Sequence, residues 1–172
     1  VKGISIAELD QCEGKFSLDR TALARTLIYS YLEQALISGM FHADPHPGNI
    51  AVNPETGELA LLDFGSVCRL SGQQKEGLKL FFIGIQQGDA SILFDAISML
   101  IKNKDDINRQ ELEQAIGQIL LKISYVNKVP TDETIYSIFT VIRESGLQFY
   151  SSVSLALRVI VTLDGTLNII DP

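Results

Sequence analysis

One short segment that cannot form a helix limits most strongly what this chain can fold into. Residues 39–49 include Gly39, Pro45, Pro47 and Gly48. Proline fixes φ and carries no amide hydrogen, and it also pushes the preceding residue toward extended backbone. We therefore expect a rigid, extended loop here that holds its polar side chains in fixed positions.

The sequence before and after this loop predicts a helix followed by a β-hairpin. Asp19 is a typical helix-capping residue and Gly39 a typical helix stop. Between them, apolar residues recur at helical spacing: Leu23, Leu27, Ile28, Tyr31, Leu32, Ala35 and Leu36. After the loop, residues 50–53 and 59–62 flank a Pro-Glu-Thr-Gly turn, which is the pattern of two paired strands.

The rest of the chain has helical periodicity. Helices are predicted to begin after Ser71, Asp89, Asn108 and Thr131, and a last one covers residues 152–167. The apolar faces of the predicted helices are expected to bury Leu27, Tyr31, Leu120 and Ile160. The predicted fold class is mostly α with one small β-hairpin.

Charge and apolar patterning exclude several classes of protein. The 172 residues carry 14 Lys plus Arg against 21 Asp plus Glu, which gives a formal net charge of −7. Such a chain is predicted to bind no nucleic acid, because that binding begins with basic residues that neutralise phosphates. Residues 153–163 are apolar but, at about 11 residues, shorter than the roughly 18 that a membrane span needs, and they include Arg158.

The polar residues that suggest chemistry lie in the loop and at the end of the hairpin. Both histidines of the chain lie in the run F-H-A-D-P-H-P-G-N at 41–49, and the second strand leads into L-L-D-F-G at 61–65. Asn49 follows Asp44 by five residues, and Asp63 follows Asn49 by fourteen. We expect the two strands to carry Asn49 and Asp63 to the same end of the hairpin.

This spacing is the one that protein kinases use for their catalytic loop and D-F-G segment. An asparagine amide oxygen and an aspartate carboxylate are hard ligands that can hold Mg²⁺ against the phosphates of ATP or ADP. A second carboxylate without a metal can orient or deprotonate the attacking oxygen. Asn49, Asp63 and Asp44 fill these three roles, in that order.

The two motifs resemble the UbiB family of atypical kinase-like proteins, which is implicated in ubiquinone and other prenyl-lipid metabolism. They are more distantly similar to protein kinases and to aminoglycoside- and choline-type small-molecule kinases. Lys2-Gly3-Ile4, Thr162-Leu163-Asp164-Gly165 and Ile170-Asp171-Pro172 also resemble segments of the family. The resemblance implies a kinase-like C-terminal lobe over residues 1–172, with catalytic loop, hairpin and D-F-G at 39–65 and a helical region at 71–172.

Carried over residue by residue, the resemblance assigns roles within the loop. It implies catalytic roles for Asp44 and for His46, which stands where many protein kinases keep a phosphate-facing lysine. It implies a structural role for His42, which braces the loop. It also implies metal ligation by Asn49 and Asp63, and a nucleotide site formed by Asn49, Asp63, Phe64 and Gly65.

The resemblance implies an ATPase or a phosphotransferase. Only five residues separate Gly65 from Ser71 and no A-P-E motif follows, so a small or lipid-associated acceptor is favoured over a protein. No glycine-rich loop or V-A-I-K lysine is present, so we expect an N-lobe to be missing and this lobe alone to be inactive. We also expect apolar surface at Phe41, Ile50, Val52 and Leu61 to make it self-associate.

The expected location is the cytoplasm. Peripheral association of the complete protein with the inner face of a bacterial membrane, or an organellar setting, stays open. Two other functions also stay open. His42, Asp44 and His46 form an H-x-D-x-H cluster of the kind found in metal-dependent hydrolases, although two histidines are few for a zinc site. A pseudokinase-like module could instead bind nucleotide or lipid without transferring phosphate.

Overall fold

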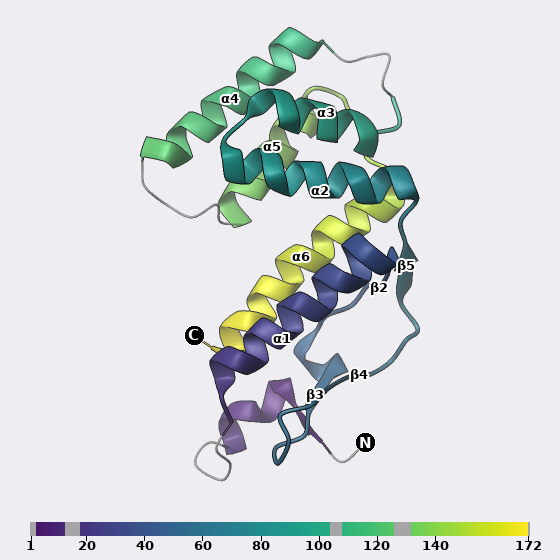
Figure 1. Cartoon of the computed structure of the whole chain (residues 1–172), viewed down its shortest axis with the longest axis vertical. Helices are drawn as coiled ribbons and strands as arrows, with labels where there is room; N and C mark the ends of the chain where they lie inside the picture. The colour runs from purple at the N-terminus through teal and green to yellow at the C-terminus, as the bar shows by residue number, and fades with distance from the viewer. Residues whose placement is uncertain (1–2, 13–17, 104–107, 126–131, 172) are drawn as a thin grey trace. The chain divides into compact units, whose positions relative to one another are not determined.

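The computed structural model describes residues 3–12, 18–103, 108–125 and 132–171. It divides into two compact units (Figure 1). The first unit combines the chain up to Arg69 with the segment from Leu155 onward, and the second is Leu70–Ser154. The described residues form six α-helices and a few short antiparallel strands, which confirms the predicted mostly-α class of a kinase-like C-terminal lobe.

The first unit opens with a short strand and a long helical segment. Its elements are β1 (Ile4–Ser5), the 3₁₀ helix η1 (Ile6–Cys12), α1 (Arg20–Leu32) and the π-helical segment η2 (Glu33–Ser38). Asp19 caps α1 as predicted, because its carboxylate accepts a hydrogen bond of 2.9 Å from the amide of Ala22. Gly39 ends the segment in the left-handed region, at φ 74°, where glycine pays no steric penalty. The predicted helix is therefore correct in extent, but its last turn is wound more widely.

Two small sheets follow the helix. The predicted hairpin is β3 (Ile50–Val52) paired with β4 (Leu59–Leu61), and β1 adds to the free edge of β3. A second sheet pairs β2 (Met40–His42) with β5 (Val67–Arg69). Strands of two or three residues are too short to show a periodicity, so β1 and the β2–β5 pair were not predictable from the sequence pattern.

The apolar cluster that was expected to be exposed beside the hairpin is buried. Phe41, Ile50 and Val52 are each buried, and Leu61 is half-buried. The expectation was wrong because β1 covers the edge of β3 and η1 packs against the same strand. The exposed apolar side chains of this region are instead Met40, Leu62, Phe64 and Val67.

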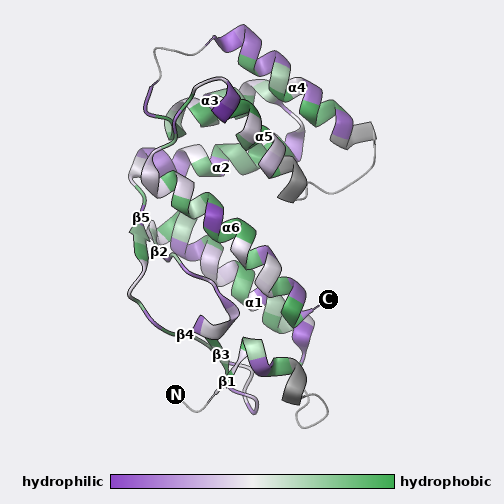
Figure 2. Ribbon diagram, turned by 180° about the vertical axis from the view of Figure 1, so that it is seen from behind, coloured by the Kyte–Doolittle hydropathy of each residue, from purple (hydrophilic) through white to green (hydrophobic). Residues whose placement is uncertain are grey.

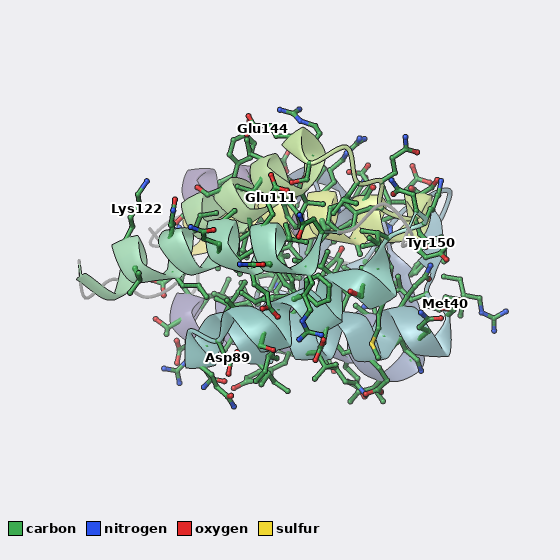
Figure 3. The ribbon with its side chains drawn as sticks, turned by 90° about the horizontal axis from the view of Figure 1, so that it is seen from above. Met40, Asp89, Glu111, Lys122, Glu144 and Tyr150 are labelled. Atoms are coloured by element: carbon green, nitrogen blue, oxygen red, sulfur yellow. The ribbon has the colours of Figure 1, made fainter. Side chains whose placement is uncertain are left out.

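The second unit consists of helices α2 (Gly72–Gln87), α3 (Ala90–Leu100), α4 (Arg109–Tyr125) and α5 (Asp132–Glu144). Ser71 forms a capping box with Gln74, and Asp89 accepts hydrogen bonds from the first turn of α3. The Asn108 side chain accepts from the amide of Glu111. These caps confirm three of the predicted helix starts, and the fourth, Thr131, lies outside the described residues. Lys122 of α4 points away from the helices of this unit (Figure 3).

Two glycines let α2 and α3 approach each other closely. A Cβ on Gly77 would lie 2.8 Å from Cδ2 of Leu100, and one on Gly84 would lie 2.7 Å from Cγ of Leu93. Arg109 then joins α4 to α3, with its guanidinium 4.5 Å from the ring centre of Phe94. Dense apolar contact therefore sets the spacing of these helices.

The last helix, α6 (Ser151–Ile170), is longer than predicted and begins in the second unit. By length and composition it is the one helix of the described chain that could cross a membrane. It contains residues 153–163, the apolar run that was expected to be too short for a span, because the helix extends beyond that run at both ends. Polar residues interrupt it (Figure 2), and from Leu155 onward it runs beside α1 within the first unit. The Thr21 hydroxyl donates to the Asp171 carboxylate where the two helices meet, at 2.9 Å. Leu27, Tyr31 and Leu120 are buried as predicted, but Ile160 is only half-buried.

Candidate active site

His42 connects the start of the loop to the end of the hairpin. The ring is only 1% exposed, and its Nδ1 accepts a hydrogen bond of 3.2 Å from the amide of Asp44. Nε2 therefore carries the hydrogen, and it lies 2.9 Å from the carbonyl oxygen of Leu62 and 3.0 Å from that of Asp63. The ring also meets the edge of Phe64, with centroids 5.3 Å apart. The neutral ring of His42 thus forms hydrogen bonds with the backbones of both Asp44 and Asp63.

The loop between Asp44 and Asn49 is closed by the Asn49 amide. Its Nδ2 donates to Asp44 Oδ2 at 2.8 Å and to the Asp44 carbonyl oxygen at 3.3 Å. The 3₁₀ turn η3 (Pro47–Asn49) sets the position of Asn49. Since Nδ2 is used within the loop, Oδ1 of Asn49 remains available as an oxygen ligand.

A second contact holds the loop from the side of α6. The hydroxyl of Thr166 is buried and donates to the carbonyl oxygen of Pro45 at 2.7 Å. The backbone amide of His42 donates to the side chain of Gln34 in η2 at 3.0 Å. Neither Thr166 nor Gln34 was a candidate from the sequence. The Thr166 contact spans 121 positions and leaves no local pattern, and the Gln34 contact spans eight positions, which is not a spacing of helix or turn hydrogen bonds.

Asp63 has an unusual backbone conformation. Its φ is 53°, and it is the one residue other than glycine with a positive φ in the described part of the chain. Aspartate tolerates this left-handed region better than most residues. Its Oδ1 accepts a hydrogen bond of 3.2 Å from the amide of Gly65, and a Cβ on Gly65 would lie 3.1 Å from that oxygen. The turn therefore fixes one carboxylate oxygen and leaves the other free.

Asn49 and Asp63 lie at the same end of the hairpin, as their spacing indicated. Ile50 pairs with Leu61, and the amide of Leu62 donates to the carbonyl oxygen of Asn49 at 2.7 Å. Neither Oδ1 of Asn49 nor Oδ2 of Asp63 accepts a hydrogen bond from any residue that the structure describes. Two hard oxygen donors are thus carried at the same end of the hairpin, and oxygen donors of this kind suit Mg²⁺.

His46 is exposed and caps η3. Its Nδ1 accepts a hydrogen bond of 3.1 Å from the amide of Gly48, so the neutral ring carries its hydrogen on Nε2. No described residue bonds Nε2. The ring is therefore oriented by the loop and keeps one N–H for a ligand.

The geometry does not support a hydrolase built on His42, Asp44 and His46. Both nitrogens of His42 are engaged with the backbone, so neither is available to a metal. Within the described ranges, no group of three or more His, Cys, Asp and Glu side chains could hold a metal ion.

An open groove of about 660 Å³ lies between α1 and the turn of the hairpin, but it belongs to a different end of the hairpin. Its lining includes Thr26, Ser30, Asn53 and Glu58. The oxygen donors of Asn49 and Asp63 lie at the opposite end, so the groove is not part of the candidate site.

Comparison with known proteins identifies similar sequences. The model of the ABC1 atypical kinase-like domain matches residues 1–96, which include the whole loop and hairpin. A Synechocystis protein of uncharacterized function is 30% identical over 174 residues, covering 99% of this chain and 29% of its own length.

Two Arabidopsis thaliana proteins are also similar. ACTIVITY OF BC1 COMPLEX KINASE 8, chloroplastic, is 42% identical over 56% of this chain and 13% of its own length. ACTIVITY OF BC1 COMPLEX KINASE 7, chloroplastic, is 26% identical over 100% of this chain and 25% of its own length. The chain thus spans less than a third of the length of these relatives.

Proposed function

This chain belongs to the ABC1 atypical kinase-like family, the UbiB family of atypical kinases, and from that premise we propose that its loop and hairpin bind Mg-ATP for phosphoryl transfer or ATP hydrolysis. The observation that carries the proposal is the hydrogen-bonded unit of His42, Asp44, Asn49 and Asp63. It supplies two free metal-ligand oxygens and one separate carboxylate, which is the set that phosphoryl transfer needs.

Asn49 and Asp63 would hold the metal. The amide of Asn49 is oriented by its two bonds to Asp44, and the carboxylate of Asp63 is oriented by Gly65. Magnesium bound there would offset the negative charge of the nucleotide phosphates. The backbone of both ligands is fixed before the metal arrives, so little reorganisation is required.

Asp44 would orient the attacking oxygen and accept its proton. Asn49 holds one carboxylate oxygen, and the side chain is otherwise exposed, so the second oxygen is accessible to an acceptor hydroxyl or to water. The free N–H of His46 would donate to a phosphate oxygen, in the place where many protein kinases keep a lysine.

We propose a small or lipid-associated acceptor. The segment after Gly65 passes at once into β5, which is paired with β2, and then into α2. The segment where protein kinases dock peptides is therefore taken up by a sheet and a helix. By family resemblance, the acceptor belongs to ubiquinone or other prenyl-lipid metabolism. Chloroplastic and cyanobacterial relatives favour a bacterial or organellar setting.

The test uses the full-length protein, with nucleotide binding and phosphate release measured in the presence and absence of Mg²⁺. Asp44→Asn keeps the size and the contact with Asn49 but removes the base. We expect it to bind Mg-ATP like wild type and to lose most of its turnover, by about 10²–10⁴-fold. Wild-type turnover in Asp44→Asn would contradict the role of Asp44. Binding without any turnover in the wild type would favour the pseudokinase-like alternative.

A further inference from the structure

The hydroxyl of Tyr31 is buried without a hydrogen-bond partner. Tyr31 lies in the last part of α1, its side chain is 4% exposed, and among the described residues its oxygen is the one buried side-chain polar atom without a partner. Folded proteins keep few such groups, because a polar group removed from water is costly unless it is bonded. We therefore expect this hydroxyl to have a role other than stabilising the fold.

The surroundings of Tyr31 point to the catalytic loop. The segment η2, which continues α1, bonds the backbone of His42 through Gln34. Burial raises the pKa of the Tyr31 hydroxyl, and the carboxylate of Asp44 raises this pKa further. The segment η2 also contacts β2 (Met40–His42), which ends two residues before Asp44, so the end of α1 and Asp44 lie in the same region of the first unit. Burial and the Asp44 carboxylate together keep the hydroxyl in its neutral, hydrogen-donating form.

One carboxylate oxygen of Asp44 has no hydrogen-bond donor among the described residues. Its Oδ2 accepts from Asn49, whereas no residue that the structure describes donates to Oδ1. The side chain is exposed, so rotation about its own torsions is unhindered by a packed core. A buried donor without an acceptor therefore lies in the same region of the first unit as a carboxylate oxygen to which no described residue donates.

We propose that Tyr31 is a positioning residue for Asp44, whose hydroxyl donates to the second carboxylate oxygen when nucleotide and acceptor occupy the site. The proposal rests on the function proposed above. Asp44 is then held by Asn49 on one oxygen and by Tyr31 on the other, so its orientation is fixed from both sides. A carboxylate oxygen has two lone pairs, so the oxygen that accepts from Tyr31 keeps one for the attacking hydroxyl or water. The acceptor's proton passes to Asp44, and Tyr31 keeps its own.

Tyr31→Phe separates this role from a structural one, because it removes the hydroxyl and keeps the ring. If the hydroxyl only fills space, its removal deletes an unpartnered polar group and leaves catalysis unchanged. If it positions Asp44, kcat falls while the melting temperature stays equal or rises. Tyr29→Phe is the matched control, since Tyr29 lies in the same helix with its side chain 69% exposed.

The experiment measures ATP turnover, nucleotide affinity and melting temperature for full-length wild type, Tyr31→Phe, Tyr29→Phe, Asp44→Asn and the Tyr31→Phe/Asp44→Asn double variant. We expect Tyr31→Phe to lower kcat about five- to tenfold, which is the loss of one ordinary hydrogen bond, with KM for ATP unchanged. The double variant should be no slower than Asp44→Asn. Tyr29→Phe should match wild type.

Two outcomes would overturn the inference, and they are distinguishable from failure of the proposed function. Wild-type kcat in Tyr31→Phe, while Asp44→Asn is inactive, overturns the role of Tyr31 alone. Wild-type turnover in Asp44→Asn overturns the proposed function, and the inference falls with it. A readout without turnover is the tyrosine ultraviolet difference spectrum on adding Mg²⁺ and a non-hydrolysable ATP analogue, with water in the acceptor position, which should be present in wild type and absent in Tyr31→Phe. The same spectrum in both proteins would also overturn the inference.

Discussion

The loop of the first unit and the helices of the second unit are held in place by different interactions. The loop is fixed by polar bonds between residues far apart in sequence, from His42 to Asp63 and from Thr166 to Pro45. The second unit is fixed by apolar contact, closest where Gly84 of α2 meets Leu93 of α3, and its caps are local. A few hydrogen bonds therefore determine the geometry of the loop, whereas the packed core determines the stability of the second unit.

This difference separates what a substitution should change in each region. Truncation within the helices of the second unit should lower the free energy of unfolding. Removal of one polar bond from the loop should lower stability little and activity more, because a small displacement of a catalytic group has a large effect on rate.

Leu120→Ala should have the largest effect on the second unit. Leu120 is buried in α4, and truncating a buried leucine costs about 2–5 kcal/mol in lost burial and cavity formation. Its neighbour Leu121 is 60% exposed, so Leu121→Ala is the matched control, expected to change stability by about 0.5 kcal/mol or less. Urea unfolding of both variants measures the difference. Equal losses would mean that the faces of α4 are misassigned.

Gly84→Ala should also destabilise the second unit, by about 1–3 kcal/mol, because the new Cβ meets Leu93 at 2.7 Å and overpacks the α2–α3 contact. Gly117 of α4 provides the control, since a Cβ there would meet nothing closer than 4.0 Å. Gly117→Ala should therefore stabilise by up to about 1 kcal/mol through helix propensity. Thermal melts should show opposite signs for the two variants. Stabilisation by both would show that the helices separate at little cost.

Thr166→Val tests the hydrogen bond that holds the loop to α6. The substitution keeps the shape of the side chain but removes the donor to Pro45, at a cost of about 1 kcal/mol or somewhat more because a buried carbonyl loses its partner. Thr162→Val is the control, because the Thr162 hydroxyl donates to the carbonyl oxygen of Arg158 in its own helix and to no other described residue. We expect Thr166→Val to lower turnover of the full-length protein more than Thr162→Val does. A loss of stability without any loss of turnover would break the distinction between the two regions.

The sequence predicted the elements whose signals are local. The cap at Asp19, the hairpin turn and the starts of α2, α3 and α4 each rest on neighbouring residues, and all are found in the structure. The placement of Asn49 and Asp63 at the same end of the hairpin followed from the geometry of paired strands. These features were predictable because the interactions that make them span few residues.

The remaining features depend on contacts that no local pattern encodes. Thr166 and Gln34 hold the loop, and the edge strand β1 buries the apolar residues of β3. The π-helical segment after α1 and the positive φ of Asp63 are likewise not signalled by the neighbouring residues. Tyr31 was expected to be a core residue, and it is buried, but its unpartnered hydroxyl becomes visible only in three dimensions.

The most direct test of the central claim is Mg²⁺-dependent nucleotide binding to full-length Asp63→Asn, measured together with its melting temperature. Asparagine tolerates a φ of 53° and can still accept from Gly65, so the fold and the melting temperature should be kept. Glu55→Gln, an exposed change of the same kind in the hairpin turn, is the control. The account predicts that Asp63→Asn loses most of its Mg²⁺-dependent affinity, whereas Glu55→Gln binds like wild type. Equal nucleotide affinity in Asp63→Asn and wild type would contradict it.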